Sequence, residues 1–146
     1  MLPTLHGVHI FAGLTDEALT LLLQRSEEQT FEPESVIVRE GETGNRMFVI
    51  ATGSVRICKH FGTENQLELA TLGTEDFFGE MCILDNFPRA ATVQATARTT
   101  VVSIPASAFH HLYKQQPAQY SVLLLNIARD LSRRLRHLDE AFASRH

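Results

Sequence analysis

The chain has 146 residues, of which 44% are hydrophobic and 21% are charged, and its formal net charge is −4 at pH 7. This length is typical of one domain, and the composition excludes a disordered tail, a collagen-like fibre and a disulfide-rich mini-protein. No apolar stretch reaches the ~18 residues of a membrane span, and the N-terminus lacks the pattern of a secretory signal. Cys58 and Cys82 are far apart, so we expect a cytoplasmic protein with free thiols.

The charge is distributed unevenly along the chain. Residues 1–128 carry a net charge of −6, whereas residues 129–146, with five arginines and three acidic residues, carry +2. An acidic body argues against nucleic-acid binding over the whole surface, and we expect no direct DNA contact from this chain. The C-terminal arginines fit either a solvated helix face, which is the commoner case, or a contact with something anionic.

A short helix is predicted near the N-terminus. Thr15 is a suitable N-cap, and Asp16 and Glu17 favour the positive end of the helix that follows. The apolar residues of this helix recur up to Leu23, so we expect it to pack on a larger body.

Residues 31–104 have the pattern of short strands interrupted by glycine-containing turns. Turn residues at 40–45 and at 52–54 tolerate a positive φ. Apolar runs and alternation predict strands at 36–38, 47–50, 54–57, 67–69, 91–95 and 99–104. Seven or eight short strands at this spacing predict an antiparallel, jelly-roll-like β-roll over about residues 30–104.

After Pro105 the apolar period becomes helical. The apolar pattern predicts one helix over Pro105–Gln116. It predicts a second, long helix that begins at Pro117 and has an apolar stripe continuing to Phe142. The predicted fold class is α+β, with the β-roll between an N-terminal helix and C-terminal helices at about 105–142, all in a single domain over 1–146. Leucines seven residues apart on the long helix also permit a homodimer through this helix: Leu124, Leu131 and Leu138.

One segment, residues 77–93, breaks the strand pattern with a helical turn, a proline and an arginine among small residues; we call it the cassette segment. Gly79 lets the backbone approach a ligand, and a helical turn beginning there presents unpaired N–H groups to an anion. Arg89 offers a planar fork of donors that suits phosphate oxygens. Glu80 would repel a phosphate and needs another partner, such as a ribose hydroxyl. A cyclic nucleotide has both groups.

The cassette segment closely resembles the phosphate-binding cassette of cyclic nucleotide-binding domains. That family includes the bacterial catabolite activator protein, the regulatory subunits of cAMP-dependent protein kinase and nucleotide-gated ion channels. The residues that carry the resemblance are Gly79-Glu80-Met81-Cys82-Ile83-Leu84 and Pro88-Arg89-Ala90-Ala91-Thr92-Val93. The similarity extends from about Phe11 to Phe142. It implies that the ligand-binding residues are Gly79, Glu80, Met81, Cys82, Arg89, Ala90, Ala91 and Thr92.

The resemblance also implies individual roles. Glu80 accepts a hydrogen bond from the ribose 2′-hydroxyl, and Gly79 lies against the sugar. Arg89 pairs with the cyclic phosphate, while the backbone N–H groups of Cys82 and Ala90 complete the cradle. Alanine after the arginine is found in members that prefer cAMP, and threonine in those that prefer cGMP. Ala90 therefore implies cAMP as the ligand, with cGMP as the alternative.

The C-terminal helix departs from the family pattern. In the catabolite activator this helix supplies hydroxyls to adenine and leads into a helix-turn-helix. Alignment on Arg133-Arg134-Leu135 places Leu138 and Asp139 at those positions. We expect Leu135, Leu138 and Asp139 to form a lid over the nucleotide. No DNA-reading domain follows, which suggests either a stand-alone regulator with an unknown effector or a piece of a larger chain.

Other function classes have less support. A cupin-like metalloenzyme needs several strand histidines, but the predicted strands hold only His60, and the pairs His6/His9 and His110/His111 lack a third ligand. We find no nucleophile and base for catalysis and no N-terminal cysteine cluster for an iron–sulfur centre. We therefore expect no catalytic residue, metal or cofactor. The alternatives that remain are the sensor fragment of a catabolite-activator-type transcription regulator, a cGMP-binding domain, and a degenerate protein-interaction domain.

Overall fold

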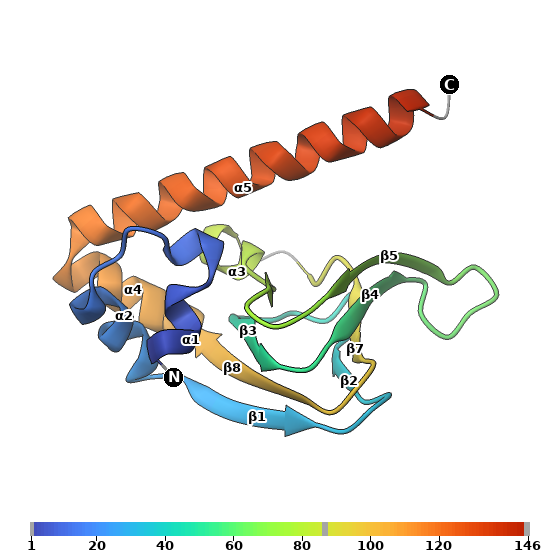
Figure 1. Ribbon diagram of the computed structural model, residues 1–146, viewed down its shortest axis with the longest axis horizontal. Coiled ribbons are helices and arrows are strands. Elements are labelled where there is room, and N and C mark those ends of the chain that lie inside the picture. The colour runs from blue at the N-terminus through green and yellow to red at the C-terminus, as the bar shows by residue number, and fades with distance from the viewer. Residues whose placement is uncertain (1, 86–87, 145–146) are drawn as a thin grey trace.

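The computed structural model describes residues 2–85 and 88–144. The helical elements are α1 (Leu2–His6), the 3-10 helix η1 (His9–Phe11), α2 (Asp16–Leu23), α3 (Met81–Leu84), α4 (Ala106–Gln115) and α5 (Pro117–Ser144). The strands are β1 (Glu27–Phe31), β2 (Val36–Val38), β3 (Arg46–Thr52), β4 (Val55–Lys59), β5 (Leu67–Leu72), β6 (Phe77–Phe78), β7 (Thr92–Ala95) and β8 (Thr99–Pro105). Helices α1, α2 and α4 lie at one end, the strands extend to the other, and the long helix α5 runs along one side of the molecule (Figure 1).

The eight strands of the described residues form two antiparallel sheets of four, in the orders β1-β8-β3-β6 and β2-β7-β4-β5. The predicted α+β class and β-roll are therefore confirmed. The sequence pattern did not predict α1, η1, β1 or β6, and it placed the start of the roll at about residue 30, whereas β1 begins at Glu27. It also began the α4 helix at Pro105, which is the residue before the helix.

Local chemistry explains two of the boundaries. The Thr15 hydroxyl accepts a hydrogen bond of 3.2 Å from the Ala18 N–H, which confirms the predicted N-cap of α2. The turn between β3 and β4 requires Gly53, whose φ is +106°. A Cβ at this position would lie only 2.6 Å from the Arg98 carbonyl oxygen, so the close return of the chain also depends on glycine.

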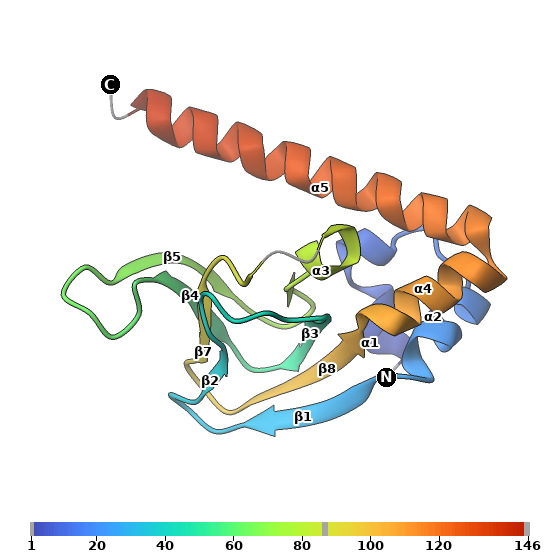
Figure 2. The same cartoon turned by 180° about the vertical axis from the view of Figure 1, so that it is seen from behind.

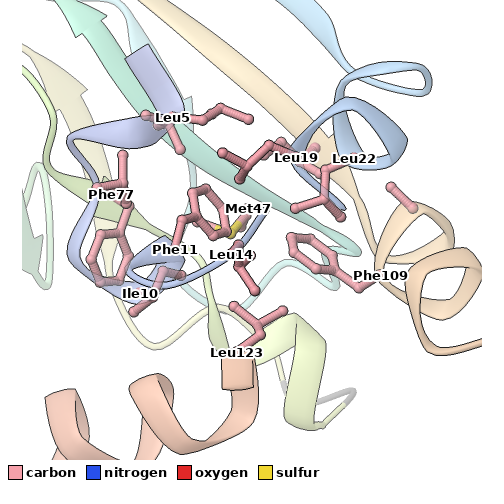
Figure 3. Packing of buried hydrophobic residues seen from close by; sticks show 14 of the residues in the cluster. Leu5, Ile10, Phe11, Leu14, Leu19, Leu22, Met47, Phe77, Phe109 and Leu123 are labelled. Atoms are coloured by element: carbon pink, nitrogen blue, oxygen red, sulfur yellow. The ribbon is translucent and has the colours of Figure 1, made fainter. Parts of the chain in front are cut away.

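The core has two parts. The larger cluster lies where the helices cover the first sheet, and Figure 3 shows side chains from α1, η1, α2, β3, α4 and α5 converging there. The smaller cluster lies between the sheets and contains Phe48, Ile50, Val55, Phe78, Val93 and Val101. Both clusters use β3, because its consecutive residues Met47, Phe48, Val49 and Ile50 are buried on opposite faces of the strand.

Helix α5 packs into the core mainly through its first half. Leu123 and Ile127 are buried, and the Asn126 side-chain NH₂ donates to the carbonyl oxygens of Ile10 (3.0 Å) and Ala12 (2.7 Å). In both views α5 runs along one side of the molecule, on the same side as α3 (Figures 1 and 2). Further along, Leu138 is 67% exposed. Within the described residues, none of the helices has the length and apolar content needed to cross a membrane.

Candidate functional site

The cassette segment begins with a backbone conformation that favours glycine. After β6, Gly79 has a φ of +80°. A Cβ here would lie 2.7 Å from Nη1 of Arg89 and 2.9 Å from the Arg46 carbonyl oxygen. Both the conformation and the lack of space thus require glycine. The chain then forms the single turn of α3; residues 86 and 87 of the segment lie outside the described residues.

The turn at residues 40–45 holds the backbone of Arg89. The Arg89 N–H donates to the Glu42 carbonyl oxygen at 2.7 Å, and its carbonyl accepts from the Gly41 N–H at 2.9 Å. Pro88, next to it, bridges to Thr43. These contacts tie the end of the cassette segment to a turn that lies about 45 residues earlier in the chain.

The guanidinium of Arg89 is fixed by neutral groups. Nη2 donates to the Arg46 carbonyl oxygen at 2.7 Å, and the guanidinium carbon lies 5.8 Å from the centre of the Phe48 ring. A Cβ at Gly44 would overlap the guanidinium. Within residues 2–85 and 88–144, no carboxylate forms an ion pair with Arg89. The result is a positioned, half-buried cation that no carboxylate of the described residues neutralises.

Glu80 is a buried carboxylate that contacts α5. Its side chain is 4% exposed, and its Oε1 accepts from Nη1 of Arg134 at 2.7 Å. Nε of Arg134 lies 2.9 Å from Oδ2 of Asp130, within ion-pair distance but without hydrogen-bond alignment. The Arg134 guanidinium also lies 5.5 Å from the Phe77 ring. Through Arg134, the long helix is therefore connected directly to the cassette segment.

The other predicted ligand residues differ in their surroundings. Met81 and Ala90 are exposed, Ala91 is half-buried, and Thr92 is buried with its hydroxyl accepting from the Glu40 N–H at 3.0 Å. Cys82 is partly buried, and burial raises the pKa of its thiol to about 11, although the Arg89 charge acts in the opposite direction. Its backbone N–H makes a hydrogen bond of 3.3 Å to the Gly79 carbonyl.

The predicted lid residues lie outside the packed part of α5. Leu135 is 60% exposed, and Leu138 and Asp139 are exposed as well. In this half of α5, Arg134 contacts the cassette segment through its hydrogen bond to Glu80. From the sequence, Arg134 served as an alignment point and as one of five arginines expected on a solvated face or at an anionic contact, and no contact with Glu80 was predicted.

Sequence analysis also missed the groups around Arg89. Gly44 was interpreted as a turn residue, and the Arg46 carbonyl and the Phe48 ring were given no part in the site. No local signal identifies them, because Arg46 and Arg89 are 43 residues apart. In contrast, the i, i+4 spacing of Asp130 and Arg134 is a recognisable helix pair.

The arrangement can bind a ligand that combines an anion with a hydroxyl group. The uncompensated Arg89 fork suits the anion, and a buried carboxylate such as Glu80 can accept from the hydroxyl. Across the described part of the chain, no group of three or more His, Cys, Asp or Glu side chains is arranged to hold a metal ion.

Comparisons with known proteins identify similar sequences and folds. A family model described as "Cyclic nucleotide-binding domain" matches residues 28–116. A "cGMP-dependent protein kinase" of Plasmodium berghei (strain Anka) is 37% identical over 89 residues, which is 61% of this chain and 10% of the kinase. A "Cyclic AMP receptor protein" of Thermus thermophilus is 30% identical over 134 residues, which is 91% of this chain and 60% of the receptor.

A solved structure supports the same relationship. The N-terminal domain of a transcriptional regulator from Streptomyces coelicolor A3(2) is 26% identical, with a TM-score of 0.78 over 95% of this chain and 94% of that one. The chain spans less than two thirds of the length of the two curated relatives.

Proposed function

Because the chain belongs to the cyclic nucleotide-binding domain family, we propose that it is a non-enzymatic sensor that binds cAMP in the cassette segment. The proposal rests on the fixed position and the uncompensated charge of the Arg89 guanidinium. The Arg46 carbonyl and the Phe48 ring fix its guanidinium, and no carboxylate neutralises it within the described residues. A preorganised cation of this kind is suited to the negative charge of a cyclic phosphate.

Glu80 supports the sugar half of the proposal. A carboxylate has two oxygens, and the Arg134 side chain donates a hydrogen bond only to Oε1 of Glu80. In the proposed complex the ribose 2′-hydroxyl donates to this carboxylate while the Arg134 ion pair compensates its charge. The phosphate is held by Arg89 together with the backbone N–H groups of Cys82 and Ala90, and for this the Cys82 N–H exchanges its 3.3 Å hydrogen bond to the Gly79 carbonyl for one to the phosphate.

The decisive experiment is a titration with cAMP in an isothermal calorimeter, for the parent chain and for Arg89→Ala. Loss of one side of a desolvated charge pair costs ~2–5 kcal/mol, or about 30- to several thousand-fold in Kd. Arg98→Ala is a matched control, because Arg98 is 73% exposed and pairs with Glu32 on the surface. Equal affinity of the parent and Arg89→Ala would refute the proposed cradle. If neither cAMP nor cGMP binds the parent, the degenerate protein-interaction domain is the better description.

The choice between cAMP and cGMP rests on Ala90. One of the relatives above is named for cGMP and another for cyclic AMP, so the family alone does not decide. Ala90→Thr adds a hydroxyl next to the phosphate site and should improve cGMP relative to cAMP, by about tenfold at most for one hydrogen bond. The ratio of the two dissociation constants measures this effect. An unchanged ratio would show that Ala90 does not determine the selectivity between cAMP and cGMP.

We propose that α5 transmits the signal. A ligand shifts an equilibrium only through its different affinities for two states, and Arg134 connects α5 to the proposed ribose ligand Glu80. Leu135 and Leu138 are exposed near Arg134 and can cover the nucleotide as a lid. Amide hydrogen exchange with and without cAMP should then show protection at 130–142 as well as in the cassette segment. Protection confined to 79–92 would contradict the lid.

The same exposed residues also suit a second copy of the chain. Leu135, Leu138 and Phe142 are each at least 60% exposed and continue the apolar stripe of α5 beyond the core. Analytical ultracentrifugation of the parent chain and of Leu138→Gln tests this homodimer. A dimer that Leu138→Gln dissociates is the expected result, and a monomeric parent at high concentration would exclude it.

A further inference from the structure

A second candidate site lies on the opposite side of α5 from the apolar stripe. It is a groove of about 560 Å³ between η1 and the middle of α5, and it shares no residue with the cassette segment. Its polar lining consists of His9, Asn126, Arg129, Ser132, Arg133 and Arg136. We call it the basic groove.

The charge of the basic groove contrasts with that of the molecule. Among the described residues, three arginines and no carboxylate line it, although residues 1–128 carry a net charge of −6. Within the described ranges, Arg129 and Arg136 form no ion pair, and Arg133 approaches Asp130 only at 4.0 Å. Asp130 itself lies against Arg134 at 2.9 Å. Among the described residues, Arg129 and Arg136 therefore have no ion-pair partner, and Arg133 has only this long contact with Asp130.

The lining favours a small polyanion over a protein partner. Protein interfaces depend on buried aromatic or apolar anchors, whereas the only apolar residue that lines this groove is Ala12. The volume of about 560 Å³ is within the range of small-molecule sites. All three cations are arginines, whose planar forks match phosphate oxygens.

The spacing of the arginines indicates more than one phosphate group. Arg129 and Arg136 are seven residues apart, or about 10 Å along the helix axis. Arginine side chains are long enough for one phosphate group to reach two of them. Arg129, Arg133 and Arg136 together present three guanidinium groups along this length, so a chain of linked phosphates can pair with all three at once. We infer that the basic groove binds a compact polyanion with two or more linked phosphate groups, either as a free polyphosphate or as the 5′-triphosphate of a nucleotide.

The basic groove is separate from the proposed nucleotide site and dimer stripe. At about 100° per residue, its three arginines lie roughly 140–200° around the helix from Leu131, which begins the exposed half of the apolar stripe. None of them contacts Glu80, whose partner on α5 is Arg134. The basic groove and the cassette segment can consequently be tested independently.

The test is calorimetric titration of the full chain with tripolyphosphate, in magnesium-free buffer at low salt. We expect one equivalent to bind in the basic groove, and orthophosphate to bind at least tenfold more weakly because it pairs with fewer of the three arginines at once. The double variant Arg129→Gln/Arg136→Gln should weaken tripolyphosphate about tenfold or more. Arg25→Gln is the matched control, since it also removes an exposed charge but lies outside the groove, and it should leave the affinity unchanged.

Two further titrations test whether the cassette segment takes part and which kind of phosphate compound binds. Arg89→Gln should retain tripolyphosphate binding, because the cassette segment is not involved; loss of binding in this variant would overturn the inference. If ATP binds more tightly than tripolyphosphate, the ligand of the basic groove is a nucleotide. If the two affinities are equal, the groove recognises the phosphate chain alone. Either result supports the basic groove as a polyphosphate site. No binding of tripolyphosphate at millimolar concentration, or equal weakening in Arg25→Gln and in the double variant, would overturn it.

Discussion

The ion pair between Glu80 and Arg134 connects α5 to the cassette segment, and breaking it should lower the stability of the chain measurably. The Glu80 side chain is 4% exposed, whereas that of Arg134 is 49% exposed, and the atoms that pair are 2.7 Å apart. In the variant Arg134→Gln the carboxylate stays buried but loses its cationic partner. The cost arises from this uncompensated charge.

The magnitude follows from the unequal burial of the two partners. Breaking a fully buried pair costs ~3–5 kcal/mol, and breaking an exposed one costs ~0–1 kcal/mol. Water can replace the half-exposed Arg134 in part, so the expected loss is about 1–2 kcal/mol. For a chain of this size that corresponds to a decrease of Tm of about 3–8 °C.

A double-mutant cycle separates the pair from its surroundings. Urea unfolding of the parent, Glu80→Gln, Arg134→Gln and the double variant should give a coupling energy of about 1–2 kcal/mol. Arg136→Gln is the control, since it removes the same charge from an exposed position of the same helix without a carboxylate partner in the described residues. It should change stability by less than ~0.5 kcal/mol. Additive effects of the two single substitutions would refute this interpretation of the pair.

The remaining predictions concern the packing around Arg89, the cassette thiol and a helix cap. A Cβ at Gly44 would overlap the Arg89 guanidinium, so Gly44→Ala should weaken cAMP binding about tenfold or more, whereas Gly73→Ala, whose Cβ meets nothing within 4 Å, should not. Burial raises the pKa of Cys82 to about 11. Iodoacetamide labelling of the folded chain at pH 8 should be about 100-fold slower than in urea and should increase up to pH 11; a plateau near pH 9 would contradict this. Thr15→Ala removes the N-cap of α2 and should cost ~1 kcal/mol in urea unfolding, and no loss would exclude the cap.

The features that the sequence alone determined are those with a local signal. The apolar period of three and four residues predicted α5, which continues only two residues beyond the predicted end at Phe142. Alternation and turn residues predicted the central strands. The cassette segment was visible because its glycine, acidic residue and arginine lie within eleven consecutive residues, 79–89.

Elements without such a signal were missed. Strand β1 is an edge strand in which every residue except Phe31 is exposed, so it has no apolar alternation to detect. Strand β6 has two residues, Phe77 and Phe78, and is defined by pairing with β3. Helix α1 has five residues and is held by the burial of Leu5 in the helical core. These short segments depend on their neighbours, since isolated helices and strands of this length are unstable in water.

Only the tertiary structure decided which side chains meet across the chain. Arg134 pairs with Glu80 over 54 residues, Arg89 donates to the Arg46 carbonyl over 43, and Asn126 ties α5 to Ile10 over 116. Residue type and spacing specify which face of a helix or strand is apolar. They do not specify which polar group of a distant element lies opposite that face. That depends on how the buried surfaces of α5, η1 and the sheets pack together, because close packing leaves few relative positions for each element.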